Sequence, residues 1–175
     1  MAHRDARRHG RGGCPGASGG RLGTVAGSSL SPPDAIVALR SLPRRFRATV
    51  MPTQEDMPTP EAVAVALDAA GTAAGELDGI GAELRRVLLN DAPDLRPIAP
   101  PEPGDRATAL DRLAASATAV AELAESQPAS AWARTGRRDG STVTAADLLR
   151  EAVQAAVDQL RTAERAWGGG TEGET

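Results

Sequence analysis

The sequence is poor in aromatic residues and rich in alanine. Its 175 residues include no tyrosine, one phenylalanine and two tryptophans, but 35 alanines. A core made of small side chains buries little apolar surface per residue, so we expect modest stability. Alanine favours closely packed helices, and a chain with so few aromatics is poorly suited to a β-sandwich. The composition therefore predicts one helical domain of ordinary size.

The sequence also lacks the features of a secreted or membrane protein. A single cysteine, Cys14, cannot form an internal disulfide or a CxxC motif. No run of about 18 apolar residues is present to span a membrane. No apolar stretch follows the N-terminal arginines, as it would in a secretory signal. We therefore expect a cytoplasmic protein that has no membrane partner.

Lysine is absent, and the arginines are spread unevenly. Residues 1–49 hold nine arginines and two acidic residues, a net charge of +7, whereas residues 50–175 carry a net charge of −10. An arginine-rich segment of this kind could bind nucleic acid. However, its first part is glycine-rich, has little to bury and lacks the interleaved aromatics on which single-stranded bases stack. We expect residues 1–32 to be a disordered extension and do not expect nucleic acid to be a partner.

Four segments show the three- and four-residue spacing of apolar side chains that is typical of amphipathic helices. They cover about residues 34–50, 59–90, 106–126 and 144–167. Thr59 is a suitable helix start, and Thr144 with Asp147 forms a capping pattern. No convincing strand pattern is found, and residues 168–175 are expected to be a disordered tail. The sequence therefore predicts an all-α four-helix bundle over residues 33–167.

Prolines and glycines indicate where these helices bend, stop or pack closely. Pro43 lies inside the first helical pattern and should kink or split that helix, since it removes a backbone hydrogen bond and clashes with the preceding turn. Gly71, Gly75 and Gly79 recur at steps of four, which indicates either a closely approaching neighbour or a flexible point. Residues 91–105 contain five prolines and form an extended connection. Its length means that adjacent helices need not be antiparallel.

The stretch from Trp132 to Trp167 opens with a W-x-R-x-G turn that is followed by V-T-A-x-D-L-L. In these motifs, and in the order of helices over residues 33–167, the sequence resembles the DinB-like superfamily. That superfamily includes the mycothiol-dependent maleylpyruvate isomerases and related thiol transferases of actinobacteria. The resemblance implies a four-helix bundle with long crossover connections, and family members are often dimeric.

The resemblance also implies a metal site. Functional members of the family bind a divalent metal through three histidines, one from the second helix and two from the last helix at H-x3-H spacing. Residues at i and i+4 share a helix face, so two such imidazoles can converge on one ion. The positions that match this pair are Gln154 and Asp158, with Gln159 beside them. Both histidines of the sequence, His3 and His9, lie in the N-terminal extension.

The donor set at these positions is weak. A glutamine amide is a poor substitute for imidazole, although Asp68, Glu76 or Asp78 could join Asp158 around Mg²⁺ or Ca²⁺. We interpret Gln154 and Asp158 as polar residues on the solvent side of the last helix, or as part of a polar pocket without metal, and we expect neither a metal nor a cofactor. Without a histidine in the bundle, a Ser/His/Asp or Cys/His nucleophile cannot be assembled either. We therefore assign no catalytic residue.

Trp132 and Arg134 lie where the family motif is clearest. Trp132 is large, and we expect it to close one end of the bundle. Arg134 should cap a helix C-terminus or pair with an acid such as Asp139, and the alternative is contact with an anionic ligand. Together with Gln159, these two residues are the candidates for a ligand pocket.

These observations favour a non-catalytic binding or interaction module with a degenerate metal site. Its partner would be an unidentified small ligand or a second copy, because an Ala/Gly-rich second helix suits a homodimer contact. The alternative is a metal-dependent mycothiol or other thiol S-transferase, or a maleylpyruvate isomerase-like enzyme, that uses altered ligands. A third hypothesis is nucleic-acid association through the arginine-rich extension. Of the three we favour the module that is not an enzyme.

Overall fold

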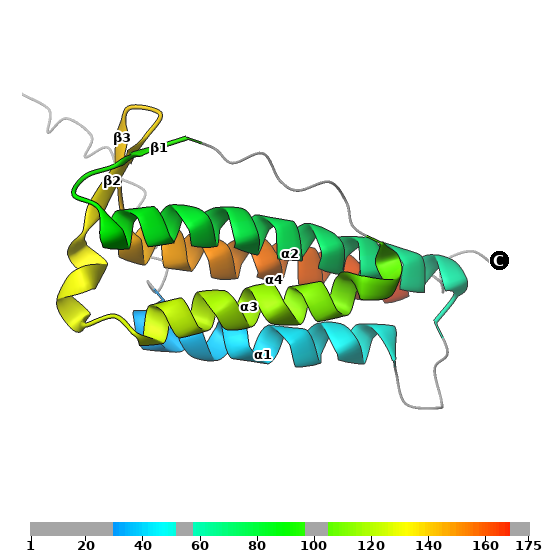
Figure 1. Cartoon of the computed structure of the whole chain (residues 1–175). Coiled ribbons are helices and arrows are strands. Elements are labelled where there is room, and N and C mark those ends of the chain that lie inside the picture. The colour runs from blue at the N-terminus through cyan, green and yellow to red at the C-terminus, as the bar shows by residue number, and fades with distance from the viewer. Residues whose placement is uncertain (1–29, 52–57, 97–104, 169–175) are drawn as a thin grey trace, which may run out of the picture.

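Four long helices form the body of the protein (Figure 1). The computed structural model describes residues 30–51, 58–96 and 105–168. The helices are α1 (Pro32–Val50), α2 (Pro60–Leu89), α3 (Ala109–Glu125) and α4 (Ala145–Gly168). Two short 3-10 helices, η1 (Arg106–Thr108) and η2 (Ala129–Ala133), lie before and after α3. The structure confirms the predicted four-helix bundle, and in the ranges that it describes none of the helices has the length and apolar character of a membrane span.

The predicted N-terminal extension and C-terminal tail lie almost entirely outside the described residues. The three described residues of the 1–32 segment belong instead to the start of α1. Leu30 packs against the core, and the Ser31 side chain accepts a hydrogen bond from the Asp34 N–H at 3.4 Å. Pro32 is the first residue of the helix, where its missing N–H costs nothing. Among the described residues, Leu30 is therefore the first that contacts the bundle.

Helix α1 continues through Pro43 and is not split. A proline inside a helix costs about 3 kcal/mol through the lost hydrogen bond and the steric clash. Leu39, Leu42 and Phe46, on either side of Pro43, are at most 1% exposed. Burying each of these side chains contributes about 1.5–3 kcal/mol. The expected split is therefore wrong, because packing against the bundle outweighs the local cost of the proline.

The four helices run in two directions. Figure 1 shows that α1 and α4 run one way, whereas α2 and α3 run the other way. α2 packs mainly against α3 and α4, and α1 also packs against α3 and α4, so α1 and α2 lie diagonally across the bundle. The consecutive helices α2 and α3 are parallel and require a connection that returns along the bundle. This agrees with the crossover predicted from the prolines of residues 91–105.

Gly81 of α2 packs tightly against Val120 of α3. A Cβ atom placed on Gly81 would lie 2.9 Å from Cγ2 of Val120, which is closer than packed carbons allow. The glycines that the sequence indicated, Gly71 and Gly79, have no such tight contact. A Cβ atom on Gly71 would make an ordinary contact of 3.9 Å with Ala109, and one on Gly79 would meet nothing within 4 Å. The predicted close approach is therefore not found at Gly71 or Gly79.

A small three-stranded sheet covers one end of the bundle. Its strands are β1 (Asp94–Leu95), β2 (Thr135–Arg138) and β3 (Ser141–Thr144), in the order β1-β2-β3. β2 and β3 form an antiparallel hairpin, and β1 pairs with β2 in parallel. The Asp139-Gly140 turn has φ angles of 50° and 80°, as type I′ turns require. We found no convincing strand pattern in the sequence, and that prediction is wrong because four-residue strands are too short to show an alternation.

The start of α4 is fixed by a reciprocal cap. Thr144 Oγ1 accepts a hydrogen bond from the Asp147 N–H, and Asp147 Oδ2 accepts one from the Thr144 N–H, each at 3.0 Å. These bonds satisfy backbone donors that the first helical turn leaves free. Further along, Leu149 and Leu160 are fully buried in a core that consists mostly of alanine and leucine. The predicted cap and the predicted inward face of this helix are both confirmed.

Candidate functional site

Two polar side chains meet between α2 and α4. Nε2 of Gln159 on α4 donates a hydrogen bond to Oε1 of Glu76 on α2, across 3.4 Å. The other carboxylate oxygen, Oε2, is buried and has no hydrogen-bond partner among the described residues. Burial raises the pKa of Glu76, the Gln159 hydrogen bond opposes this rise, and the nearby charge of Asp158 adds to it. The sequence named both residues separately, and the structure brings them together.

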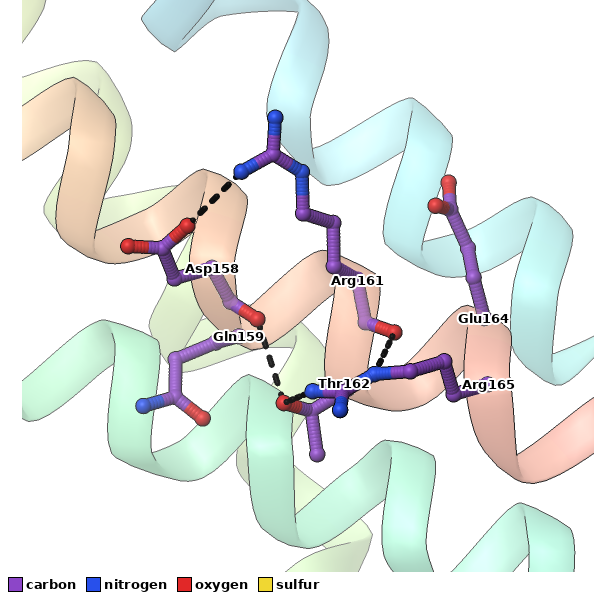
Figure 2. Close-up of a pocket in the computed structure, with 6 residues that line it drawn as sticks. All are labelled: Asp158, Gln159, Arg161, Thr162, Glu164 and Arg165. Carbon is purple, nitrogen blue, oxygen red and sulfur yellow. Dashed lines mark hydrogen bonds and ion pairs between the residues drawn. The ribbon is translucent and has the colours of Figure 1, made fainter.

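Gln154 and Asp158 lie on the exposed face of α4, one turn apart. Gln154 Nε2 donates to Oδ1 of Asp158 at 2.8 Å, and Arg161 Nη1 donates to the same oxygen at 3.0 Å. Figure 2 shows this face, where an open hollow of about 660 Å³ is lined by residues of α4 alone. The structure therefore places these two residues where we interpreted them, on the solvent side of the helix. Of the three polar residues at the positions of the family motif, Gln159 is the one that meets a side chain of α2.

The residues between α2 and α4 do not fit a transition metal of the kind that the resemblance implies. Such a centre takes three or four strong donors, usually imidazoles, thiolates or carboxylates. Here Glu76 offers one free carboxylate oxygen, Gln159 offers an amide, and Asp158 is already engaged at the surface. In the described ranges no group of three His, Cys, Asp or Glu side chains converges on one point. His3, His9 and Cys14 lie outside the described residues.

A second charged cluster lies under the sheet and ties it to the bundle. Arg138 of β2 donates hydrogen bonds to Glu83 of α2 through Nη2 and to Glu151 of α4 through Nη1, the latter at 2.8 and 2.9 Å. The side chain of Glu83 is only 7% exposed. Burial lowers the pKa of Arg138, but the hydrogen bonds and charges of the two carboxylates outweigh this and raise it above its ordinary value.

This cluster was not predicted from the sequence, although one feature pointed to it. Glu83 lies three residues after Ile80 and four before Val87, so it falls within the apolar stripe of the second helix. A charged residue on an inward face needs a partner of opposite charge. The partner could not be identified from the sequence, because Arg137 and Arg138 are adjacent and the strand that turns one of them inward was not predicted.

Trp132 and Arg134 lie at the sheet end of the bundle, away from Gln159. Trp132 is half-buried against the core, in agreement with its predicted position. Arg134 forms an ion pair of 3.0 Å with Asp91, which follows α2, rather than with Asp139. The Ala145 N–H bonds to the carbonyl of Arg134, and Gln159 follows fourteen residues of α4 later, about 21 Å along the helix. The three residues proposed as one pocket are therefore not brought together.

Comparison with known proteins gives one informative similarity. No protein-family model matches the chain, and no curated protein matches it in sequence. In structure it is similar to YfiT from Bacillus subtilis, which is described as a probable metal-dependent hydrolase with an unusual four-helix bundle topology. The TM-score is 0.64 at 14% sequence identity, over 79% of this chain and 89% of YfiT. Identity this low shows the fold alone, which is a four-helix bundle.

Proposed function

We propose that this chain is a non-catalytic binding or interaction module, built on a DinB-like bundle and working in the cytoplasm. The observation that supports this most is the hydrogen bond between Gln159 of α4 and Glu76 of α2. It joins the two helices through an amide, at the place where a metal-dependent enzyme would need a strong metal donor. The interface between α2 and α4 is thus better suited to holding the bundle together than to holding an ion.

Catalytic metal chemistry makes demands that these side chains meet poorly. A catalytic zinc centre holds its ion by three protein ligands and lowers the pKa of a bound water to about 7. Oδ1 of Asp158 already accepts hydrogen bonds from Gln154 and Arg161. Oε1 of Glu76 already accepts one from Gln159. The neutral amide of Gln159 adds no charge to attract a cation. These hydrogen bonds favour a structural role for the polar residues on both helices.

The rival function is a metal-dependent thiol S-transferase or isomerase with altered ligands. Two observations support it. The fold is shared with YfiT, a probable metal-dependent hydrolase, and the unpartnered Oε2 of Glu76 is an acceptor that a hard cation such as Mg²⁺ would bind. Mg²⁺ usually keeps several waters and is held by only one or two protein carboxylates. The rival therefore predicts a bound oxygen-preferring cation at Glu76.

Elemental analysis of the untagged full-length protein after dialysis separates the two functions. Our proposal predicts far less than one metal ion per chain. About one tightly held ion per chain would contradict it and would support the rival. Glu76→Ala should then remove the ion, whereas Glu122→Ala, an exposed glutamate on α3, serves as the matched control and should leave it bound.

A further inference from the structure

The middle of α2 contains residues that stabilise a helix poorly. Gly71, Gly75 and Gly79 recur there at every fourth position, and after proline glycine is the least favourable residue inside a helix. A Cβ atom on Gly71 would make only an ordinary contact of 3.9 Å, and one on Gly79 would meet nothing within 4 Å. Close packing of a neighbouring helix therefore does not account for these two glycines.

This segment, residues 71–79, also buries little apolar surface. Leu77 is its one large side chain that is fully buried, and its other buried side chains are those of Ala73 and Ala74. The next turns of α2 bury three large apolar side chains, Leu84, Val87 and Leu88. A segment with few buried apolar contacts opens locally at a lower free energy than the whole fold does. We therefore expect residues 71–79 to open more readily than the rest of α2.

Glu76 lies at the centre of this segment, and one of its carboxylate oxygens has no partner. Oε2 is buried and forms no hydrogen bond within the described ranges. Gln159 donates to the other oxygen across 3.4 Å, which is longer than the usual distance of about 2.7–3.2 Å. An ionised carboxylate that loses water without gaining partners destabilises the closed arrangement. The protonated acid has no net charge, so its burial costs less.

The charges around Glu76 add to this cost. Burial raises the pKa of Glu76 above its ordinary value of 4.5, and the negative charge of Asp158 on α4 raises it further. Arg161 donates to Asp158 at 3.0 Å and neutralises it in part. From η1, Arg106 is held by Asp68, about two turns before Glu76. In the part of the chain that the structure describes, no side chain of α1 or α3 pairs with Glu76.

We propose that residues 71–79 of α2 form a pH-controlled opening segment, which stays closed on α4 while Glu76 is protonated and opens locally once Glu76 is ionised. Protonation of Glu76 favours the closed state fully below its ordinary pKa of 4.5, and this preference is lost as the pH rises through the higher pKa of the folded chain. Opening returns water to the carboxylate and exposes the contact with Gln159. The inference needs neither a metal nor a partner, so it is independent of the proposed function.

Native-state hydrogen exchange of the full chain, followed by NMR at pH 4 and pH 7, tests this opening. The rates are divided by the intrinsic exchange rates at each pH to give protection factors. The amides of residues 72–80 should be less protected than those of residues 84–88 of α2 and 148–160 of α4. Relative to these two reference segments, their protection should fall between pH 4 and pH 7.

Glu76→Gln removes the charge and keeps the shape of the side chain. It should raise the protection of the opening segment at pH 7 by about threefold or more, with little change at pH 4. Asp158→Asn, at an exposed position, removes the neighbouring charge and should act in the same direction by a smaller factor. Glu122→Gln is the matched control, because it changes the net charge equally on the exposed face of α3 and should alter neither value.

Gly79→Ala separates the stability of the helix from the ionisation of Glu76. Its Cβ atom has room, and alanine should raise the protection of the segment by about fivefold at both pH values. Three results would overturn the inference: protection of the segment equal to that of residues 84–88, no gain from Glu76→Gln at pH 7, or an equal gain from it at both pH values. If Glu76→Gln does not fold, the absence of a gain from Asp158→Asn at pH 7 would overturn it instead.

Discussion

Glu83 of α2 and Arg138 of β2 form an ion pair from which water is largely excluded, with side chains 7% and 22% exposed. The same guanidinium also binds Glu151 of α4, whose side chain is 45% exposed. One arginine thus fastens the sheet to two helices that run in opposite directions. Because the two carboxylates differ so much in exposure, they should differ in their effect on stability.

Removing Glu83 should destabilise the protein far more than removing Glu151. Breaking a buried ion pair typically costs about 3–5 kcal/mol. Because Glu151 still neutralises Arg138, we expect Glu83→Ala to lower the free energy of unfolding by about 2–3 kcal/mol. Glu151→Ala removes a largely solvated contact and should cost less than about 1 kcal/mol. Urea unfolding of both variants measures the free energies. Equal losses would show that the burial of Glu83 does not strengthen its pairing.

The cap of α4 should make stability depend on acid pH. Hydrogen bonds from the Thr144 side chain and backbone lower the pKa of Asp147 below its ordinary value of 3.8. The unfolded chain therefore binds a proton at a higher pH than the folded chain does, and the stabilisation is present above pH 3.8 and lost as the pH falls through the folded pKa. Asp147→Ala should cost about 1 kcal/mol at pH 7.

The same substitution should cost less near pH 2, because below pH 3.8 the parent progressively loses the advantage of the charged cap. Unfolding by urea at the two pH values measures the difference. Thr144→Ala is the matched variant, because it removes one donor to Asp147 and leaves the backbone donor in place. A loss that is the same at both pH values would mean that the ionised carboxylate is not the capping group.

The inward face of α4 can be tested by two neighbouring substitutions. Leu160 is fully buried, whereas Arg161 is exposed and pairs with Asp158 on the same helix. Leu160→Ala should cost about 2–5 kcal/mol through lost burial and the cavity that remains. Arg161→Ala should cost less than about 0.5 kcal/mol. Thermal and urea unfolding would give similar values for the two variants only if the helix were rotated from its position in this structure.

The helices could be predicted closely from the sequence because their ends carry local information. Thr59 and Thr144 accept hydrogen bonds from the first turns of α2 and α4, and the predicted starts fall within one residue of these helices. The apolar spacing of α4 likewise agrees with its buried face, on which Leu149 and Leu160 lie. Caps and periodicity act within a few residues, so a single sequence contains them in full.

The candidate site could not be predicted in the same way, because it depends on how α2 is rotated and shifted against α4. Gln159 and Glu76 are 83 residues apart in the chain. The family motif directed attention to Gln154 and Asp158, which the structure places on the exposed face. A change of one position along a helix turns a side chain by about 100°. The periodicity of each helix does not specify which of its polar residues contacts the other helix.

The polar contact between α2 and α4 lacks the donors that a transition metal needs. Gln159 faces Glu76, and Ala155 lies one turn earlier on the same face of α4. The triple variant Glu76→His/Ala155→His/Gln159→His therefore places three imidazoles around this point. In a control, Glu76→His is combined with Gln154→His and Asp158→His, which point to solvent.

Titration with Zn²⁺ by isothermal calorimetry is the most direct measurement. Any weak binding by His3, His9 or Cys14 is common to all variants and is removed by comparison with the parent. We predict that the triple variant binds one Zn²⁺ at least about 100-fold more tightly than the parent, because three imidazoles complete the usual ligand set, and that the control gains much less. A parent chain that already binds one Zn²⁺ as tightly as the triple variant would contradict the account.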